Sequence, residues 1–348
     1  MKFLLFLLLS SSCLLVQAQF PPVTTPSVSP LATVTQRIGL TDITVRYSRP
    51  GVKDREVWGS LVPYNEGEPF PWRAGADENT TISFTHEVKI NGKTIPAGTY
   101  GIHVIPDKEE WIIAFSNNAT SWGSFFYKEK EDALRVKVTP TAIPHKEWLE
   151  FEFTPVNRKT TSLALKWAKL QGAFEITVAV DEIVLESMRN ELRSTPAFSW
   201  VGWYSAAAYC LKYEVNLEEA LRWCEESVSR QKNFTNLSTQ AKLLEKLDRS
   251  KEAEKSIEQA LAVGTVRDLH AYGRELIEAD QPKQALKVFQ INAERHPDTW
   301  PVNVGLGRGH MALGDSKTAV KYFKKALKQA PDVFNRDNLQ ELIDNLEQ

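Results

Sequence analysis

One stretch between two predicted strands combines aromatic, cationic and carboxylate side chains. Within residues 49–79 these are Arg49, Asp54, Arg55, Trp58, Tyr64, Phe70, Trp72, Arg73, Asp77 and Glu78. Aromatic faces stack on sugar rings or peptide groups, while arginine and carboxylate groups orient a polar ligand. A segment of that length without strand alternation in a compact domain is usually either functional or a sign that the strands have been wrongly assigned. We therefore predict a ligand-binding site formed by Arg49, Trp72, Arg73, Glu78 and, from a later strand, His103.

A structural role for the same charges is the alternative. Arg49 and Arg73 would then pair with Asp54, Asp77 or Glu78 and pin the loop to the domain. A buried lattice of ion pairs would favour this alternative, and an open cleft would favour ligand binding.

Signals for metal binding and catalysis are weak. His86 shares the apolar face of its strand and is expected to be a core histidine, whereas His103 has the opposite parity from Ile102 and Val104 and is expected to face solvent. No third metal ligand accompanies them, so we predict no metal site and no cofactor. The sequence has no Gly-x-Ser-x-Gly, His-Glu-x-x-His or glycine-rich phosphate motif, and a non-enzymatic role is favoured.

The elements that must position these side chains follow a two-residue period from about 31 to 180. The clearest run is 81–90, where Ile82, Phe84, His86, Val88 and Ile90 alternate with polar residues. Further predicted strands cover 43–48, 100–105, 111–115, 134–138, 149–153, 163–167 and 174–180. Turn residues such as Asn91-Gly92 separate them. Short antiparallel strands without helical periodicity predict an all-β antiparallel sandwich, jelly-roll or Ig-like.

From residue 181 to 348 the pattern has a helical period. Ala285, Phe289 and Pro297 recur 34 residues later as Ala319, Phe323 and Pro331, and Gly273 recurs as Gly307. This is the tetratricopeptide period, with small residues where paired helices approach closely. Weaker copies begin near 201 and 234, so we predict four helix pairs and a final helix at 338–346. The second domain is therefore predicted to be an all-α tetratricopeptide-like solenoid.

Four segments of the first domain resemble a bacterial family of secreted proteins, the domain of unknown function 2911 family. They are residues 29–50, Leu61-Val-Pro-Tyr64, Trp72-Arg-Ala-Gly-Ala-Asp-Glu-Asn-Thr-Thr-Ile82 and Ile90-Asn-Gly-Lys-Thr-Ile-Pro-Ala-Gly-Thr-Tyr-Gly101. The resemblance covers about residues 29–180 and implies no particular activity. Compared with the family pattern, residues 65–71 are an insertion. The helical part is similar to tetratricopeptide arrays, which implies protein or peptide binding.

The N-terminus predicts export. Residues 1–18 combine Lys2, a short apolar run and small residues before Gln19, as in a signal peptide, and 19–30 read as a Pro/Ser/Thr-rich linker. No later stretch is apolar enough to predict a membrane span. After cleavage only Cys210 and Cys224 remain, and their helical context favours buried thiols over a disulfide.

The predicted function is that of an exported binding or scaffold protein, periplasmic or secreted. Its sandwich would contact a ligand or the cell envelope, and its repeats would bind a protein or peptide. The net charge of −2 gives no reason to expect nucleic acid. Two alternatives are a carbohydrate-binding module and an envelope hydrolase that uses carboxylates of residues 49–79.

Overall fold

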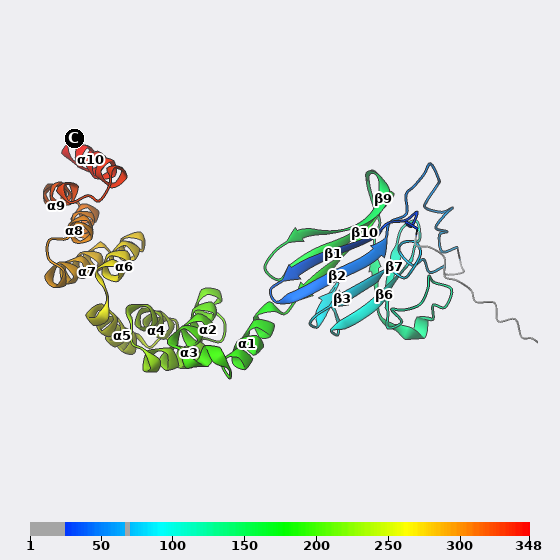
Figure 1. Ribbon diagram of the computed structural model, residues 1–348, viewed down its shortest axis with the longest axis horizontal. Helices are drawn as coiled ribbons and strands as arrows, with labels where there is room; N and C mark the ends of the chain where they lie inside the picture. Colours follow the sequence, from blue (N-terminus) through cyan, green and yellow to red (C-terminus); the bar gives the residue numbers. More distant parts are fainter. Residues whose placement is uncertain (1–24, 67–69) are drawn as a thin grey trace, which may run out of the picture. The chain divides into compact units, whose positions relative to one another are not determined.

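The computed structural model describes residues 25–66 and 70–348 (Figure 1). The chain divides into two compact units, the first ending at Val180 and the second spanning Asp181–Gln348. The predicted signal peptide and the first half of the predicted linker lie outside the described residues. The end of the linker is hydrogen-bonded to the first domain, because the Arg49 amide donates to the Pro30 carbonyl at 2.9 Å.

The first domain consists of two antiparallel sheets. The six-stranded sheet has the order β1 (Leu31–Ile38), β2 (Thr41–Ser48), β3 (Thr81–Phe84), β6 (Gly98–Ile105), β7 (Trp111–Ser116) and β8 (Asp132–Val138). The four-stranded sheet has the order β5 (Lys93–Ile95), β4 (Val88–Ile90), β10 (Thr160–Val178) and β9 (Thr141–Val156). A short 3₁₀ helix, Glu129–Glu131, precedes β8.

The core of this domain lies between the two sheets. Ile43 and Val45 of β2 are fully buried and alternate with partly exposed Thr44. From the facing sheets, Phe115 of β7 and Phe174 of β10 pack edge to face with ring centroids 5.4 Å apart. The predicted antiparallel sandwich is confirmed.

The run at 81–90 is not one strand, as we predicted, but two strands in different sheets. β3 ends at Phe84 and β4 begins at Val88. Between them the Thr85 amide donates to the Asp42 carbonyl at 3.1 Å, and the Thr85 hydroxyl accepts from the Asp42 amide at 2.9 Å. The chain therefore leaves the six-stranded sheet at this point and enters the four-stranded one. Both β3 and β4 keep their apolar side chains in the core, so the alternation in the sequence continues across the break.

The predicted strands at 163–167 and 174–180 are joined in one strand, β10. Ala168 has a φ of 51°, and the register with β9 shifts on both sides of it. A bulge of this kind lets a strand continue through residues that do not alternate. The sequence pattern is lost there although the pairing continues.

The second domain is entirely helical. It opens with α1 (Val180–Glu191) and a 3₁₀ helix (Thr195–Phe198). Four helix pairs follow: α2 (Trp200–Tyr213) with α3 (Leu217–Arg230), α4 (Phe234–Lys246) with α5 (Ser250–Val263), α6 (Val266–Glu278) with α7 (Pro282–Arg295), and α8 (Trp300–Ala312) with α9 (Ser316–Lys328). The last helix, α10 (Val333–Glu347), begins earlier than predicted because Asp332 caps it by accepting from the Asn335 amide.

The 34-residue repeat has a direct packing counterpart. A Cβ atom on Gly273 would lie 2.3 Å from Cε1 of Phe289, and one on Gly307 would lie 2.4 Å from Cε1 of Phe323. Both phenylalanines are fully buried. Each aromatic ring therefore occupies the space that a larger residue on the preceding helix would need, and the predicted helix pairs are confirmed.

Cys210 and Cys224 are both buried free thiols. Burial raises the pKa of Cys210 to about 11 and that of Cys224 to about 12. Neither is therefore in the reactive thiolate form at neutral pH. None of the helices in the described part of the chain is both long and apolar enough to cross a membrane.

Candidate functional site

The loop between β2 and β3, residues 49–80, is held against both sheets. Gly51 forms a bridge with Trp148 of β9, and Trp72 forms one with Val104 of β6. In the second bridge the Trp72 amide donates to the Val104 carbonyl at 2.8 Å, and the Val104 amide donates back at 2.7 Å. The loop is therefore bridged to a strand of each of the two sheets.

Four tryptophans form the base of this loop. The Trp72 indole stacks on Trp167 with ring centroids 5.6 Å apart, and Trp58 contacts both of them edge-on. Trp58 also lies 4.5 Å from the buried Trp111 ring and donates its indole N–H to the Trp167 carbonyl. Large, buried aromatic rings of this kind provide rigid walls for a binding site.

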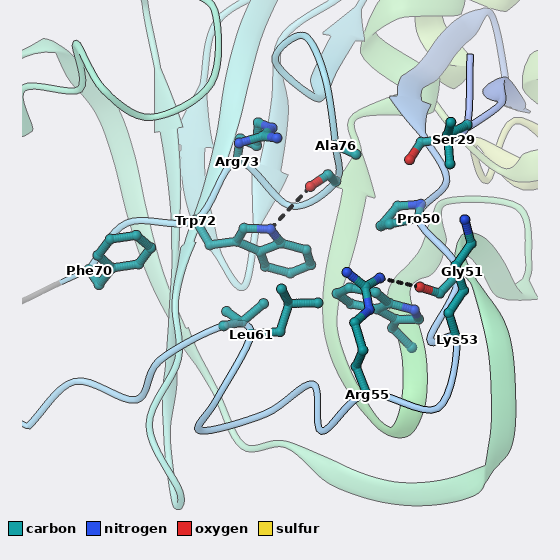
Figure 2. Close-up of a pocket in the computed structure, with 14 residues that line it drawn as sticks. Ser29, Pro50, Gly51, Lys53, Arg55, Leu61, Phe70, Trp72, Arg73 and Ala76 are labelled. Atoms are coloured by element: carbon teal, nitrogen blue, oxygen red, sulfur yellow. Dashed lines mark hydrogen bonds between the residues drawn. The ribbon is translucent and has the colours of Figure 1, made fainter. Parts of the chain in front are cut away.

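A hollow of about 360 Å³ opens above these rings. Its lining residues come from the end of the linker, the loop and β10: Val28, Ser29, Pro50, Gly51, Lys53, Arg55, Leu61, Val62, Phe70, Trp72, Arg73, Gly75, Ala76 and Trp167. Figure 2 shows Phe70 and Arg73 on one side of the Trp72 indole, and Arg55 and Lys53 on the other. We call this the tryptophan-floored hollow.

The charged residues that line the tryptophan-floored hollow are all cationic. They are Lys53, Arg55 and Arg73, and no aspartate or glutamate lines the hollow among residues 25–66 and 70–348. Arg55 is held in place because its side chain donates to the Gly51 carbonyl at 2.7 Å and to the Val52 carbonyl at 3.0 Å. The site therefore favours a negatively charged group.

Arg73 is the cation with the strongest need for a partner. Its Nε is buried and has no hydrogen-bond partner among the residues that the structure describes. Burial lowers the pKa of its guanidinium, and nearby Asp77 acts in the opposite direction. A buried donor without an acceptor costs about 1–3 kcal/mol, so an anion that reached Arg73 would recover part of this cost.

Arg73 also lines a second hollow, of about 190 Å³, together with Phe70, Pro71, Trp72, Ser124 and Phe125. Its guanidinium carbon lies 5.5 Å from the centroid of the Trp122 ring. Trp122 and Phe125 stack on each other, and their side chains are 56% and 78% exposed. The two hollows thus meet at Arg73, beside exposed aromatic faces that a ring-shaped ligand could stack on.

His103 was expected to face solvent, but it is only 2% exposed. Segment 117–127 covers that face of β6: Ser124 Oγ lies 2.8 Å from His103 Nδ1, and the Tyr127 ring lies 4.7 Å away. Burial lowers the pKa of His103 to about 4, and no neighbouring charge contributes to the shift. Without a carboxylate to stabilise an imidazolium, the Ser124–His103 pair is a poor nucleophile and base. Its evident effect is to hold the wall of the second hollow.

The five predicted site residues do not all converge. Trp72 and Arg73 line both hollows, and His103 supports Ser124 from beneath. Glu78 is exposed and lines neither hollow. Arg49 is used structurally, because its Nε donates to the Leu149 carbonyl at 2.8 Å.

The ion pairs proposed as the structural alternative are wrong. Arg49 pairs with Glu150 of β9 at 3.7 Å, and Arg73 forms no ion pair within the described residues. Asp77 instead accepts a hydrogen bond from the Ser27 hydroxyl at 2.7 Å. The loop is pinned by backbone bridges and the tryptophan cluster, which leaves Arg73 available.

Several residues of the site were not predicted, among them Arg55, Ser124 and Trp167. Arg55 belongs to the same loop but carried no signal that separated it from the other charges. Trp167 and Ser124 lie far along the chain, on β10 and on the segment after β7, and only the fold brings them to the loop.

His86, expected in the core, is half-buried beside the Thr41 hydroxyl at 3.1 Å. Among residues 25–66 and 70–348 no group of three or more His, Cys, Asp or Glu could hold a metal ion.

Comparison with known proteins agrees with the two predicted resemblances. Residues 29–176 match the family described as "Protein of unknown function (DUF2911)", and residues 301–333 match a tetratricopeptide repeat. No curated protein matches the chain. The family description names no activity, so the function of the first domain has to be argued from its geometry.

Solved structures similar to the chain include a Pseudomonas aeruginosa protein and two tetratricopeptide repeat proteins. Pseudomonas aeruginosa pilF shares 18% identity over 42% of this chain and 67% of its own, with a TM-score of 0.30. A tetratricopeptide repeat protein from Parabacteroides merdae shares 18% identity over 46% of this chain and 66% of its own, with a TM-score of 0.31. YrrB, described as having an unusual peptide-binding site, shares 18% identity over 46% of this chain and 83% of its own, with a TM-score of 0.30.

Proposed function

We propose that this protein is an exported binding protein with two recognition surfaces. The β domain binds an anionic ligand at Arg73, and the tetratricopeptide repeats bind a protein or peptide partner. The repeat array supports a scaffold role, since stacked helix pairs present an extended surface to other chains. Export rests on the signal-peptide pattern of residues 1–18.

One observation carries the β-domain proposal, and it concerns the part of the chain that the structure describes. There, Arg73 is half-buried, its Nε lacks a partner, and it opens onto two hollows whose charged lining residues are all cationic. A guanidinium binds a carboxylate through two parallel hydrogen bonds. The flat indole of Trp72 lies beside it and offers a stacking face. The ligand class that fits both features is a carboxylate-bearing sugar or the carboxylate of a peptide.

Hydrolysis by loop carboxylates has less support than binding. A carboxylate pair that acts as acid and base must flank the bond to be cleaved. Neither Asp77 nor Glu78 lines either hollow, and Asp77 is engaged by Ser27. A neutral carbohydrate-binding module would use the aromatic faces but would leave the unpartnered Arg73 without a role.

The test compares acidic sugars with their neutral counterparts. We would titrate the protein from Gln19 to Gln348 with glucuronate and glucose, and with N-acetylmuramate and N-acetylglucosamine, by isothermal calorimetry and thermal shift. Binding of an acid but not its neutral counterpart is expected, and Arg73→Met should abolish it. Arg73→Lys, which keeps the charge but loses the planar fork, should retain only part of the affinity.

The matched control is Arg37→Met, because Arg37 is an exposed arginine of the same domain that pairs with Asp42 at 2.7 Å. It should bind like the wild type. Equal binding of neutral and acidic sugars, or equal losses in the Arg37 and Arg73 variants, would contradict an anion site at Arg73.

A further inference from the structure

Three helices of the solenoid carry a cation at the same position. Each lies eight residues after the start of the first helix of a pair: Lys242 after Phe234 in α4, Arg274 after Val266 in α6, and Arg308 after Trp300 in α8. The first helices of the third and fourth pairs, α6 and α8, contact each other, so Arg274 and Arg308 at equivalent positions are neighbours, and Lys242 reaches α6 through its ion pair with Glu275. In Figure 1 α6 and α8 lie on the inner side of the bend of the helical domain. The repeat therefore places a row of cations on one face.

The cations of this row differ in how they are neutralised. Lys242 pairs with Glu275 at 2.5 Å, and Arg274 has only a long contact of 3.9 Å to Glu278. Arg308 has neither an ion pair nor a hydrogen bond within the part of the chain that the structure describes, and its Nε is buried. Burial lowers the pKa of Arg308, and repulsion from Arg274 lowers it further.

A histidine one helical turn before Arg274 completes the cluster. His270 is half-buried, and its Nδ1 is buried without a hydrogen-bond partner. Burial lowers its pKa first, and then the charges of Arg308 and Arg274; only the Pro301 carbonyl acts in the opposite direction. His270 also lies against α8, because a Cβ atom on Gly305, three residues before Arg308, would be 3.2 Å from its Nδ1. Two like charges and an imidazole with one unsatisfied nitrogen are thus clustered where α6 meets α8, and no carboxylate pairs with Arg308 among the described residues.

We propose that His270, Arg274 and Arg308 form a carboxylate-binding notch that recognises an acidic side chain of an extended peptide segment in the partner protein. This rests on the protein-binding role proposed above and adds the chemistry of the partner. A carboxylate here would accept from Arg308 and offset the repulsion between the two arginines. The two exposed glutamates near the row, Glu275 and Glu278, serve Lys242 and Arg274 and leave Arg308 unpaired.

A groove of about 700 Å³ lies between the second and third helix pairs. Its apolar lining is Leu211, Ala241, Ala253, Ile257 and Tyr272, and its polar lining is Lys242, Glu245, Lys246, Glu254, Gln281 and Gln284. Lys242 of the cation row lines this groove, so a peptide that follows the row from the notch can place an apolar side chain in the groove. The partner segment is therefore expected to combine an acidic residue with an apolar one.

The experiment is a fluorescence-anisotropy titration of the protein from Gln19 to Gln348 with three labelled peptides of equal length: oligoglutamate, oligoglutamine and oligolysine. Oligoglutamate should bind best, with an affinity that falls as salt is raised. Arg308→Gln should weaken it by about tenfold or more, as expected for a half-buried charge pair, and the more exposed Arg274→Gln by less. Arg222→Gln removes an exposed arginine from the second helix of the first pair and should change nothing.

Circular dichroism and thermal unfolding establish that each variant is folded, and Arg308→Lys provides a second check because it retains the charge and should retain part of the affinity. Equal binding of oligoglutamate by the Arg308 and Arg222 variants would overturn the notch while leaving peptide binding intact. Preference for oligoglutamine or oligolysine would overturn the acidic specificity. A failure of all three peptides to bind would count against the notch and against the peptide-binding role itself.

Discussion

The two domains each contain a half-buried arginine whose Nε has no partner, but they hold it in different ways. Arg73 lies on a loop, beneath Trp122 and beside the Trp72 and Trp167 stack. Arg308 lies in the middle of a helix, at a position that two other repeats also fill with a cation. The β domain therefore builds its site from residues distant in sequence, whereas the solenoid builds its site by repetition.

The surrounding charges differ as well. Burial lowers the pKa of both guanidinium groups. The negative charge of Asp77 partly offsets this at Arg73, whereas repulsion from Arg274 lowers the pKa of Arg308 further. The same contrast holds for the histidines, since burial alone lowers the pKa of His103 whereas two arginines contribute to the shift at His270. The β-domain histidine thus reports on packing, whereas the solenoid histidine reports on packing first and on charge in addition.

The largest expected effect concerns His103 and pH. An unfolded histidine has a pKa of about 6.5, and the folded value is about 4, so between these values the unfolded chain binds more protons. The contribution of His103 to stability is present above about pH 6.5 and falls by about 3 kcal/mol as pH drops to about 4. Urea unfolding of the β domain, followed by tryptophan fluorescence, should show this loss.

His103→Gln is the control, since glutamine can still accept a hydrogen bond from Ser124 but does not titrate. The difference between the wild type and this variant should depend on pH only below about 6.5. A difference that is constant with pH would show that His103 is not protected from protonation and that the covering segment 117–127 is open in solution.

The next effect tests the repeat. Gly273→Ala and Gly307→Ala each force a methyl group against a buried phenylalanine, and the clash should outweigh the about 1 kcal/mol that alanine gains over glycine in a helix. A net loss of about 1–2 kcal/mol is expected in the unfolding of the helical domain, similar for the two variants. Phe289→Leu and Phe323→Leu, combined with the matching alanine, should recover part of it.

Similar values would support equivalent packing in the third and fourth helix pairs. Stabilisation by either alanine would contradict the close approach of glycine and phenylalanine on which the repeat depends.

The first domain builds its site from residues distant in sequence, and the second builds its site by repetition. This difference also explains how much of each domain the sequence could predict. Strand alternation and the 34-residue period predict the two architectures because each is a local or periodic pattern. The break at Thr85 and the bulge at Ala168 were missed because neither interrupts the burial of apolar residues in a recognisable way. Trp72 and Arg73 were found by residue type, whereas Trp167 and Ser124 depend on contacts across the fold. The cation row was present in the sequence but is visible only when helix starts are known.

A smaller effect separates structural from ligand-binding arginines in the β domain. Arg49→Met leaves the Leu149 carbonyl without its donor and should cost about 1–2 kcal/mol. Arg73→Met removes an unsatisfied donor and should change the free energy of unfolding by less than about 0.5 kcal/mol. Denaturant unfolding of the two variants without ligand measures both values. A larger loss for Arg73→Met than for Arg49→Met would assign Arg73 to the structure rather than to a ligand.

The smallest effect tests the charge cluster directly. Arg308→Gln removes a positive charge that lowers the pKa of His270, so this pKa should rise towards its ordinary value without any ligand. Histidine resonances followed by NMR as a function of pH measure the shift. His103, whose pKa is lowered by burial alone, should not move in the same variant. Binding of oligoglutamate to the wild type should likewise raise the pKa of His270, because a nearby carboxylate favours the protonated ring. An unchanged His270 in Arg308→Gln would mean that the two side chains are not close enough to interact, and the notch could not then hold one carboxylate between them.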